Sequence, residues 1–451
     1  MAPVSAPARH SFHIVSLGCT KNTVDSEAMA QLLLAAGHER APDAASADLV
    51  VVNTCGFIES AKQESIDTLL ELGDAKRDGQ KLVATGCLVE RYADELQQEL
   101  PVVDGFLGAR NWASLPSLAS QVLEHVRAPG DSLGLVQLAE PGALDLEILQ
   151  RHASGPSAYV KISDGCDQRC AFCAIPFMKG NHRSKPAEQV LREIGQLVSQ
   201  GVKEVVLVGQ DTTRYGHDLG VRDGLAPLLE SITDRFPSLA WLRVMYAYPR
   251  HITPRFLQVL RERPQVLPYV DMPLQHTHPW ALARMRRPHR DVDELVSWMR
   301  SCVPELVLRT TFIVGFPGET EAEFQHLLES VQRLKFDRVG VFTYSDEEGT
   351  ASYAMGDRVP QKVKVRRQQA LMSAARDVTM AANKALIGQE MDVLIEGQPE
   401  AGSEWYAGRS YRDAPEVDGL VLVKALSLPV GEFARVRIER ALAYDLLARP
   451  V

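Results

Sequence analysis

The sequence has few aromatic residues, no long apolar run and no excess of positive charge. Aromatics make up 6 % of the 451 residues, and no stretch reaches the roughly 18 apolar residues of a membrane span. The formal net charge of -9 argues against a polycation that binds nucleic acid along its whole length. Residues 1–15 lack the apolar core of a secretory signal peptide. We therefore expect a cytoplasmic protein without a membrane segment.

Cysteine is also scarce, with seven residues in the chain. An odd number of cysteines in a long intracellular chain is a poor disulfide framework. Metal or cluster ligation, or plain buried thiols, are the remaining interpretations. Hydrophobic residues make up 45 % of the chain and charged residues 24 %, which is typical of a globular protein large enough for two or three domains.

Four regions follow one another along the chain. Residues 11–127 alternate short apolar runs with helical patterns, which predicts an N-terminal α/β domain built on a parallel sheet. Residues 128–151 lie in a stretch rich in Pro, Gly and Ala and are predicted to form a linker. Residues 152–386 carry six strand–helix units, fewer than the eight of a closed TIM barrel, so we expect a partial (β/α)6 barrel. Residues 387–451 predict a small antiparallel, OB-like β-barrel.

The strands of the terminal barrel are the least regular of these predictions. Short apolar stretches separated by Gly and Pro place them at 391–395, 405–411, 420–425 and 432–439. The sequence therefore predicts four strands in this domain.

Three cysteines follow the first strand of the predicted central barrel. Cys166, Cys170 and Cys173 have CxxxCxxC spacing and lie at the carboxyl end of a strand, where α/β barrels hold their chemistry. Three thiolates hold three irons of a four-iron cluster and leave the fourth open to the amino and carboxylate groups of a substrate. A zinc site or buried thiols are the alternatives, but no His or Cys lies at the usual spacing for a fourth zinc ligand. The spacing favours an iron–sulfur cluster.

A second set of cysteines is scattered along the first domain. Cys19, Cys55 and Cys87 each follow one of three predicted strands, and a glycine adjoins each of them. The carboxyl ends of parallel strands meet at one edge of a sheet, where ligands gather. Three unrelated buried thiols are the alternative. If both sets hold clusters with an open iron, one cluster makes a radical while the other holds or supplies sulfur.

The motif around Cys166 resembles that of the radical S-adenosylmethionine superfamily. This resemblance implies a partial barrel and the reductive cleavage of S-adenosylmethionine to a 5′-deoxyadenosyl radical. It places Phe172 beside the adenine. It also implies cofactor contacts from residues at the ends of later strands, namely Gln210, Asp211, Gln275, Gly315 and Glu319. The superfamily's Gly-Gly-Glu turn is replaced here by Gly-Gln-Asp at residues 209–211.

Residues 16–22, 53–57 and 85–87 resemble the signature of the methylthiotransferases, and the similarity extends over nearly the whole chain. The resemblance implies a terminal barrel of the TRAM type and two 4Fe-4S clusters, each held by three cysteines that serve as the catalytic residues. It implies two molecules of S-adenosylmethionine per turnover. One methylates cluster-bound sulfur, and the other yields the radical that removes hydrogen from the substrate. A flavodoxin or ferredoxin is the implied electron donor.

This family divides between enzymes that modify adenosine in transfer RNA and a branch that modifies the β-carbon of an aspartate in ribosomal protein S12 of the small subunit. Residues 18–22, 57–65, 174–180 and 273–279 resemble the protein branch. The alternatives are a transfer RNA adenosine methylthiotransferase and, in another class, a non-catalytic iron–sulfur carrier or scaffold.

The charge of the last domain is consistent with the protein branch. Eleven acidic and seven basic residues lie between Gly388 and Val451. An RNA-binding barrel should lean basic because phosphates dominate affinity, so RNA binding by this domain is not expected. An acidic barrel suits a basic ribosomal protein, although a solvated acidic surface is equally consistent with the charge.

Some residues have a pattern that predicts a structural role as readily as a chemical one. Cys302 has no partner at useful spacing and is expected to be a packed thiol. We favour a cofactor or substrate contact for His276 and no role for His278. Lys185 has either a carboxylate partner or a surface position. Tyr406 is expected in the barrel core or at an apolar interface.

Overall fold

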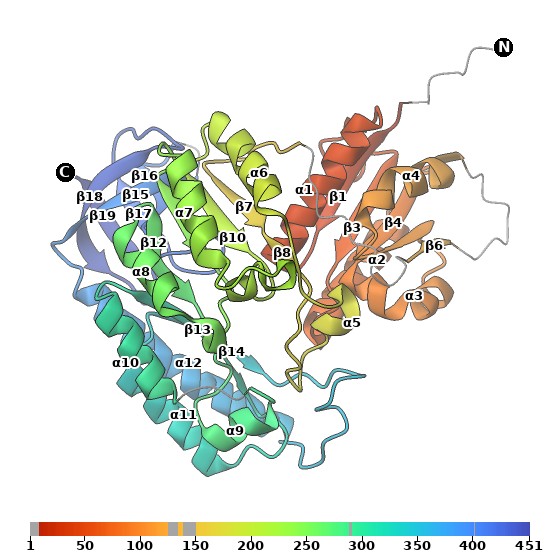
Figure 1. The fold of residues 1–451 in the computed structure, drawn as a ribbon. Coiled ribbons are helices and arrows are strands. Elements are labelled where there is room, and N and C mark those ends of the chain that lie inside the picture. Colours follow the sequence, from red (N-terminus) through yellow and green to blue (C-terminus); the bar gives the residue numbers. More distant parts are fainter. Residues whose placement is uncertain (1–8, 125–133, 139–149, 288–290, 401) are drawn as a thin grey trace.

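The structure, a computed structural model, describes residues 9–124, 134–138, 150–287, 291–400 and 402–451. The N-terminal α/β domain and the terminal β-barrel lie on opposite sides of the central α/β domain (Figure 1). The predicted mixed α/β fold class is confirmed. Within the described residues, no helix is long and apolar enough to cross a membrane.

The N-terminal domain is built on a six-stranded parallel sheet in the order β2-β1-β3-β4-β5-β6. All six residues of β3 are buried because helices cover both faces of the sheet. The elements are β1 (Ser11–Ser16), α1 (Thr20–Ala35), β2 (Glu39–Arg40), β3 (Leu49–Thr54), α2 (Glu59–Asp74), β4 (Lys81–Gly86), α3 (Cys87–Glu99), β5 (Gly105–Gly108), α4 (Leu115–Glu124) and β6 (Leu135–Gln137).

The predicted linker at 128–151 contains an element of this sheet. Strand β6 pairs in parallel with β5, with Leu135 opposite Gly105. The sheet therefore extends beyond the predicted boundary at residue 127. A three-residue edge strand has too short a pattern to stand out from its Gly-rich surroundings. Residues 125–133 and 139–149 of this region lie outside the described residues.

The central domain is an open six-stranded parallel sheet in the order β14-β13-β12-β11-β10-β7, as predicted for a partial barrel. A small antiparallel pair, β8–β9, follows its first strand. The elements are β7 (Ser157–Lys161), β8 (Ser163–Asp164), α5 (Ile175–Lys179), β9 (Arg183–Ser184), α6 (Ala187–Ser199), β10 (Glu204–Val208), α7 (Leu225–Arg235), β11 (Trp241–Val244), α8 (Pro254–Glu262), β12 (Val266–Asp271), α9 (Pro279–Arg284), α10 (Val292–Cys302), β13 (Val307–Val314), α11 (Glu321–Leu334), β14 (Arg338–Thr343) and α12 (Gln361–Lys384).

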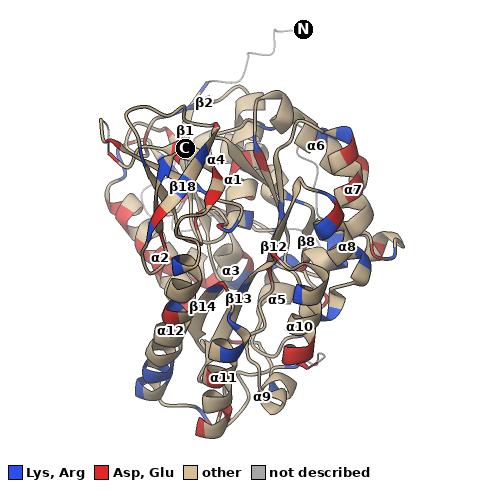
Figure 2. Cartoon of the chain, turned by 90° about the vertical axis from the view of Figure 1, so that its left-hand side faces the viewer, with Lys and Arg blue, Asp and Glu red and all other residues tan. Residues whose placement is uncertain are grey.

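Helix α12 carries the chain from the central sheet to the terminal barrel. Lysines and arginines gather at its amino end, seen at the lower left of Figure 2, and Arg366 and Arg367 pair there with Glu321 of α11. These pairs fasten the helix to the central domain before the barrel begins.

The terminal domain is a closed barrel in which the prediction of four strands missed a fifth. Its strands are β15 (Glu390–Gly397), β16 (Trp405–Arg409), β17 (Val421–Lys424), β18 (Phe433–Ala441) and β19 (Leu446–Pro450). The ring closes because β19 lies between β17 and β18, and its pairing with β17 is parallel. The prediction of a wholly antiparallel barrel is therefore corrected at this pair. Tyr406 lies in the barrel core, as expected.

The terminal barrel docks near the amino ends of the central strands. Glu204, the first residue of β10, accepts hydrogen bonds from Arg243 (2.7 Å) and from Arg409 of the barrel (2.6 Å). These three side chains are at most 1 % exposed. Nearby, Tyr159 donates to the Pro415 carbonyl, so a loop of the barrel fills the inside of the curved sheet. The carboxyl ends of the strands lie on the opposite edge of the sheet, away from the barrel.

Candidate functional site

The cysteines of the N-terminal domain meet at one edge of its sheet. Cys19 directly precedes α1, Cys55 directly follows β3, and Cys87 is the first residue of α3 after β4. Strands β1, β3 and β4 are neighbours in the sheet. The three loops therefore lie side by side, as the sequence predicts. We call Cys19, Cys55 and Cys87 the front set.

Glycines let these loops approach closely. A Cβ on Gly18 would lie 2.7 Å from the Cβ of Cys55, and one on Gly86 would lie 2.5 Å from the Thr54 carbonyl oxygen. Both glycines also have positive φ, 87° and 104°, which favours glycine. A side chain at either position would force two cysteine loops apart.

Buried polar side chains tie the same loops together. The amide of Asn22 donates to the carbonyls of Leu17 (3.0 Å) and Thr54 (3.1 Å). The amide of Asn53 donates to the Asn22 carbonyl at 2.9 Å, and the hydroxyl of Thr54 to the Thr85 carbonyl at 2.5 Å. Because three of these four bonds join two different cysteine loops, the spacing of the front set is fixed by the fold rather than by flexible loops.

The thiols of the front set influence one another. Burial raises the pKa of Cys55 to about 11, and the nearby Cys19 contributes. Burial raises the pKa of Cys87 to about 12, with contributions from both of the other thiols. Cys19 is exposed, so the set opens to solvent on one side. The thiols of Cys55 and Cys87 stay protonated at neutral pH until a metal displaces the protons.

The cysteines of the central domain, Cys166, Cys170 and Cys173, form what we call the middle set. They lie in the loop between β8 and α5. Backbone bonds hold this loop, with the Cys166 amide donating to Gly180 and the Cys173 amide to Cys170, both at 3.1 Å. Burial raises the pKa of Cys166 to about 12, to which Cys170 contributes, and raises that of Cys173 further. In the described parts of the chain, no three His, Cys, Asp or Glu side chains have the arrangement of a preformed metal site.

An arginine that the sequence analysis did not single out contacts the middle set. The guanidinium of Arg287 donates to the Cys170 sulfur at 3.3 Å and lies over the ring of Tyr248, 4.4 Å from its centroid. Arg287 is buried, so its charge acts on the sulfur with little screening by water. It follows α9, far from Cys170 in sequence, so no local motif could have pointed to it.

Two of the predicted cofactor residues lie beside the middle set. Gln210 donates its amide to the Asp164 carboxylate at 2.8 Å, while its own carbonyl oxygen is buried without a partner. Asp211 is buried, accepts hydrogen bonds from Thr213 (2.7 Å) and His251 (3.0 Å), and raises the pKa of the Cys166 thiol. The unpartnered oxygen of Gln210 is an acceptor that a bound amine would satisfy.

The other predicted contacts are Phe172, in the middle-set loop, and residues on the turns that follow β12 and β13. Phe172 is half-buried and its ring lies 6.5 Å from that of Phe316, within the turn that begins at Gly315. Gln275 has a positive φ of 72° and its backbone bridges to β13. Glu319 folds back on its own turn, where its carboxylate accepts a hydrogen bond from the Gly315 amide. Glu319 therefore shapes the turn in this structure.

The remaining residues considered in the sequence analysis make contacts that stabilise the fold. Nδ1 of His276 accepts hydrogen bonds from the next two backbone amides, both at 2.9 Å, so this buried ring caps its own turn. His278 caps α9 by accepting from the Trp280 amide. Lys185 is buried and donates to Glu193 at 2.5 Å, so the surface alternative for Lys185 is wrong. Cys302 packs against the core of the central domain, as expected.

The loops that carry the two sets meet at the seam between the domains. Cys87 packs in one cluster with Ala174 and Met178 of the middle-set loop and α5. On the same seam, the ammonium of Lys21 lies 3.1 Å from the ring centroid of Tyr246, which follows β11. The front edge of the first domain thus rests on the carboxyl edge of the second.

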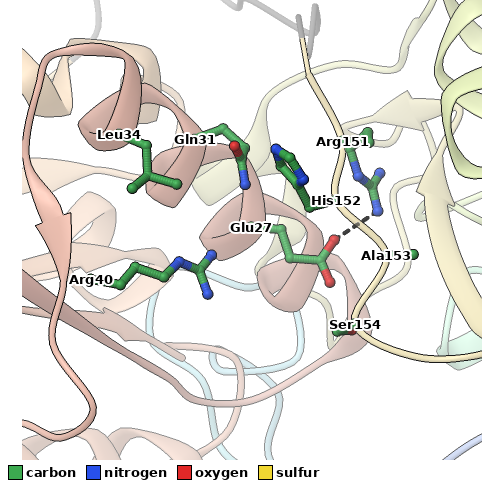
Figure 3. A pocket seen from close by; sticks show the side chains of 8 residues that line it. All are labelled: Glu27, Gln31, Leu34, Arg40, Arg151, His152, Ala153 and Ser154. Atoms are coloured by element: carbon green, nitrogen blue, oxygen red, sulfur yellow. Dashed lines mark hydrogen bonds and ion pairs between the residues drawn. The ribbon is translucent and has the colours of Figure 1, made fainter. Parts of the chain in front are cut away.

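A cavity of about 320 Å³ lies elsewhere on the seam, between α1 and residues 150–154 (Figure 3). Its wall contains the ion pair between Arg151 and Glu27, at 2.7 Å, which joins the two domains. No cysteine lines it. This cavity marks a second contact between the domains, separate from the cysteine sets.

Comparisons with known proteins agree with this architecture. Residues 11–108 match the uncharacterized protein family UPF0004, residues 160–331 the radical SAM superfamily, and residues 387–451 the TRAM domain. Among curated relatives, the ribosomal protein uS12 methylthiotransferase RimO of Herpetosiphon aurantiacus is 43% identical, over 96% of this chain and 98% of the relative. Proteins of the same name from a Roseiflexus species and from Chloroflexus aurantiacus are each 44% identical, again over 96% of this chain and over 96% and 98% of their own length.

Solved structures share the fold at low identity. The radical S-adenosylmethionine methyltransferase TsrM from Kitasatospora setae has a TM-score of 0.55 at 15% identity, covering 74% of this chain and 72% of its own. The cobalamin-dependent S-adenosylmethionine radical enzyme OxsB has a TM-score of 0.51 at 9% identity, covering 82% and 57%. At these identities the likeness concerns the fold alone.

Proposed function

The chain belongs to the family of ribosomal protein uS12 methylthiotransferases, and on that premise we propose that it attaches a methylthio group to the β-carbon of an aspartate in this ribosomal protein. The observation that carries the proposal is similarity at 42% to 44% identity over 96% of the chain. We also propose that the reaction takes place in the cytoplasm, where ribosomes assemble.

We infer the cofactors from the superfamily and from the two sets of cysteines. A 4Fe-4S cluster and S-adenosylmethionine belong to the radical SAM superfamily, and we assign the first cluster to the middle set. We assign a second 4Fe-4S cluster to the front set, since its three thiols share one sheet edge. When bound, the first supplies the electron that cleaves S-adenosylmethionine, and the second holds the sulfur to be transferred.

The protein's own residues have distinct tasks in this proposal. Arg287 stabilises the thiolate of Cys170 by donating to its sulfur. The free carbonyl oxygen of Gln210 accepts a hydrogen bond from the amino group of S-adenosylmethionine, and Phe172 packs against the adenine. Both assignments agree with the position of these residues around the middle set.

The charge of the terminal barrel supports a protein substrate over RNA. Its docking on the central domain uses two of its bases, Arg409 and Arg412, and three of its acids, Asp413, Asp418 and Glu432. Eight acidic and five basic residues of the barrel remain outside these pairs. The excess of acidic residues therefore stays on the free surface of the barrel. Such a surface attracts a basic protein and repels phosphates. A small flavodoxin or ferredoxin is the proposed electron donor.

The test is mass spectrometry of small-subunit ribosomal proteins from a strain that lacks the gene. We expect the methylthio adduct on the S12 protein to disappear and to return when the wild-type gene is restored, but not with a Cys19→Ala copy. Loss of methylthioadenosine from transfer RNA, with the S12 adduct intact, would instead favour the RNA branch. Iron binding without cleavage of S-adenosylmethionine by the purified protein would favour a carrier.

A further inference from the structure

Four buried charges meet where the two domains join, between the front and middle sets. Asp25 lies on α1, Lys161 ends β7, Asp164 lies in β8, and Lys179 ends α5. All four side chains are at most 6 % exposed. We call these four residues the seam quartet.

Each charge of the seam quartet contacts both opposite charges. Lys161 pairs with Asp25 and, at 3.0 Å, with Asp164. Lys179 pairs with Asp25 at 3.0 Å and with Asp164 at 3.7 Å. Two ammonium groups balance two carboxylates, so the quartet is neutral as a whole. Only Asp25 comes from the N-terminal domain, and both of its carboxylate oxygens bind lysines of the central domain.

Every segment that contributes to the quartet also carries a cysteine loop. Helix α1 begins at the residue after Cys19, and Asp164 stands two residues before Cys166. Helix α5 follows Cys173 and packs against Cys87 through Met178. A shift of any of these segments would therefore change the position of one set relative to the other.

Buried ion pairs contribute little net stability because desolvation offsets the attraction, but they do specify a geometry. Apolar packing alone would hold the domains together but would fix their relative position less precisely. We propose that the seam quartet is a positioning device that fixes the front set against the middle set, so that radical formation is coupled to sulfur transfer. This inference rests on the proposed second cluster.

The chain provides a matched control on the same helix. Glu27, two residues after Asp25, also joins the two domains through an ion pair, with Arg151 at 2.7 Å. It lies at the cavity of Figure 3, which no cysteine lines. Glu27→Gln and Asp25→Asn thus each remove one interdomain carboxylate from α1, and only Asp25 belongs to the quartet.

The first measurement uses the metal-free, reduced full chain and follows alkylation of single cysteines by mass spectrometry. Cys87 is 7% exposed and should react slowly in the wild type, whereas the exposed Cys19 is an internal standard. In Asp25→Asn the two lysines share the single carboxylate of Asp164, which leaves one buried positive charge uncompensated. We therefore expect the seam to open more often and Cys87 to react at least about tenfold faster than in the wild type. Glu27→Gln should react like the wild type.

The second measurement uses the iron-loaded enzyme and compares 5′-deoxyadenosine with thiolated product. In Asp25→Asn we expect about tenfold more 5′-deoxyadenosine per product, with unchanged iron content, because radicals form while the sulfur is misplaced. An equal loss of both products would indicate a general structural role and overturn the proposal. So would an Asp25→Asn protein that matches Glu27→Gln in both measurements.

A second variant covers the case in which Asp25→Asn does not fold. The double variant Asp25→Asn, Lys179→Met keeps the Lys161–Asp164 pair at 3.0 Å and restores neutrality, but it removes the tie between α1 and α5. We expect it to fold and to show the same fast alkylation of Cys87. Slow alkylation in this variant would refute the positioning role. If the wild type holds only four irons, the proposal of a second cluster is wrong. The alkylation of the metal-free chain still tests whether the seam quartet holds the two domains in position.

Discussion

Replacing Glu204 by glutamine removes one of the carboxylates that join the terminal barrel to the central sheet. Glu204 accepts hydrogen bonds from Arg243 on the neighbouring strand and from Arg409 of the barrel, and all three side chains are buried. In the variant, Glu396 still lies 2.7 Å from Arg409. The charge left without a carboxylate is therefore mainly that of Arg243, in the inside of the curved sheet.

The magnitude follows from the titration of this carboxyl group. Burial alone would raise the pKa of Glu204, but the guanidinium groups of Arg243 and Arg409 lower it from 4.5 to about 2. A depressed carboxyl pKa stabilises the folded state above the unfolded pKa, and this contribution is lost as the pH falls from about 4.5 to about 2. At about 1.4 kcal/mol per pKa unit, the contribution is about 3 kcal/mol near neutral pH.

The assay is urea unfolding of the full chain at neutral pH, followed by tryptophan fluorescence. The ring of Trp241 lies 4.7 Å from that of Phe433 of the barrel, so its emission reports on docking. A parallel series with Trp241→Phe isolates this signal. We expect the docking transition of Glu204→Gln to move to lower urea by roughly 1–2 M. The control is Glu439→Gln, which breaks an exposed pair with Arg449 and should change stability by less than about 0.5 kcal/mol.

The pH dependence provides the refutation. The gap between the wild type and Glu204→Gln should be widest above about pH 5 and should close as the pH falls towards 2. Equal midpoints at neutral pH, or a gap that stays constant down to pH 2, would show that this carboxylate does not hold the barrel in place.

Three further predictions concern the cysteine sets. Replacing Cys19, Cys55 and Cys87 together by alanine should leave one cluster and retain 5′-deoxyadenosine formation while thiolation stops; an unchanged iron count would contradict the second cluster. Arg287→Met should lower the rate of 5′-deoxyadenosine formation about tenfold, because the bond to the Cys170 sulfur is lost, and Arg287→Lys should recover part of it in the same chromatographic assay. Binding of a cluster to the front set near pH 8 should release at least two protons, since the pKa values of Cys55 and Cys87 lie at about 11 and 12. A pH-stat titration measures this release. Iron uptake without proton release would show that these thiols are not ligands.

Much of the fold follows from local patterns. The six strands of the central sheet form as predicted because apolar runs bounded by polar residues specify buried parallel strands. Strand β10 is an example, since all five of its residues are buried. The grouping of Cys19, Cys55 and Cys87 was also predictable, since a cysteine after each of three parallel strands must lie at one edge. Local spacing was enough here because the sheet itself brings the segments together.

The missed features depend on contacts between distant segments. Arg287 reaches Cys170 across 117 positions, and Asp25 reaches Lys161 across 136. Strands β6 and β19 are short and belong to sheets only through neighbours that come earlier in the chain. In the sequence, a charged residue that is buried in the fold cannot be distinguished from one on the surface. Its partner lies far away along the chain, and no local pattern identifies that partner. Such pairs become visible only when the domains are placed side by side.

The way the terminal barrel closes the inside of the curved sheet has a consequence for engineering. Tyr159, Arg243 and Tyr269 meet the barrel loop in the interior of the central domain, where Tyr269 donates to Asp418 at 2.6 Å. Truncation before residue 387 would leave these groups open to water and would damage the radical domain itself. A chimera that exchanges barrels between RNA-modifying and protein-modifying enzymes must therefore retain residues 409–418 together with the sheet that they fit.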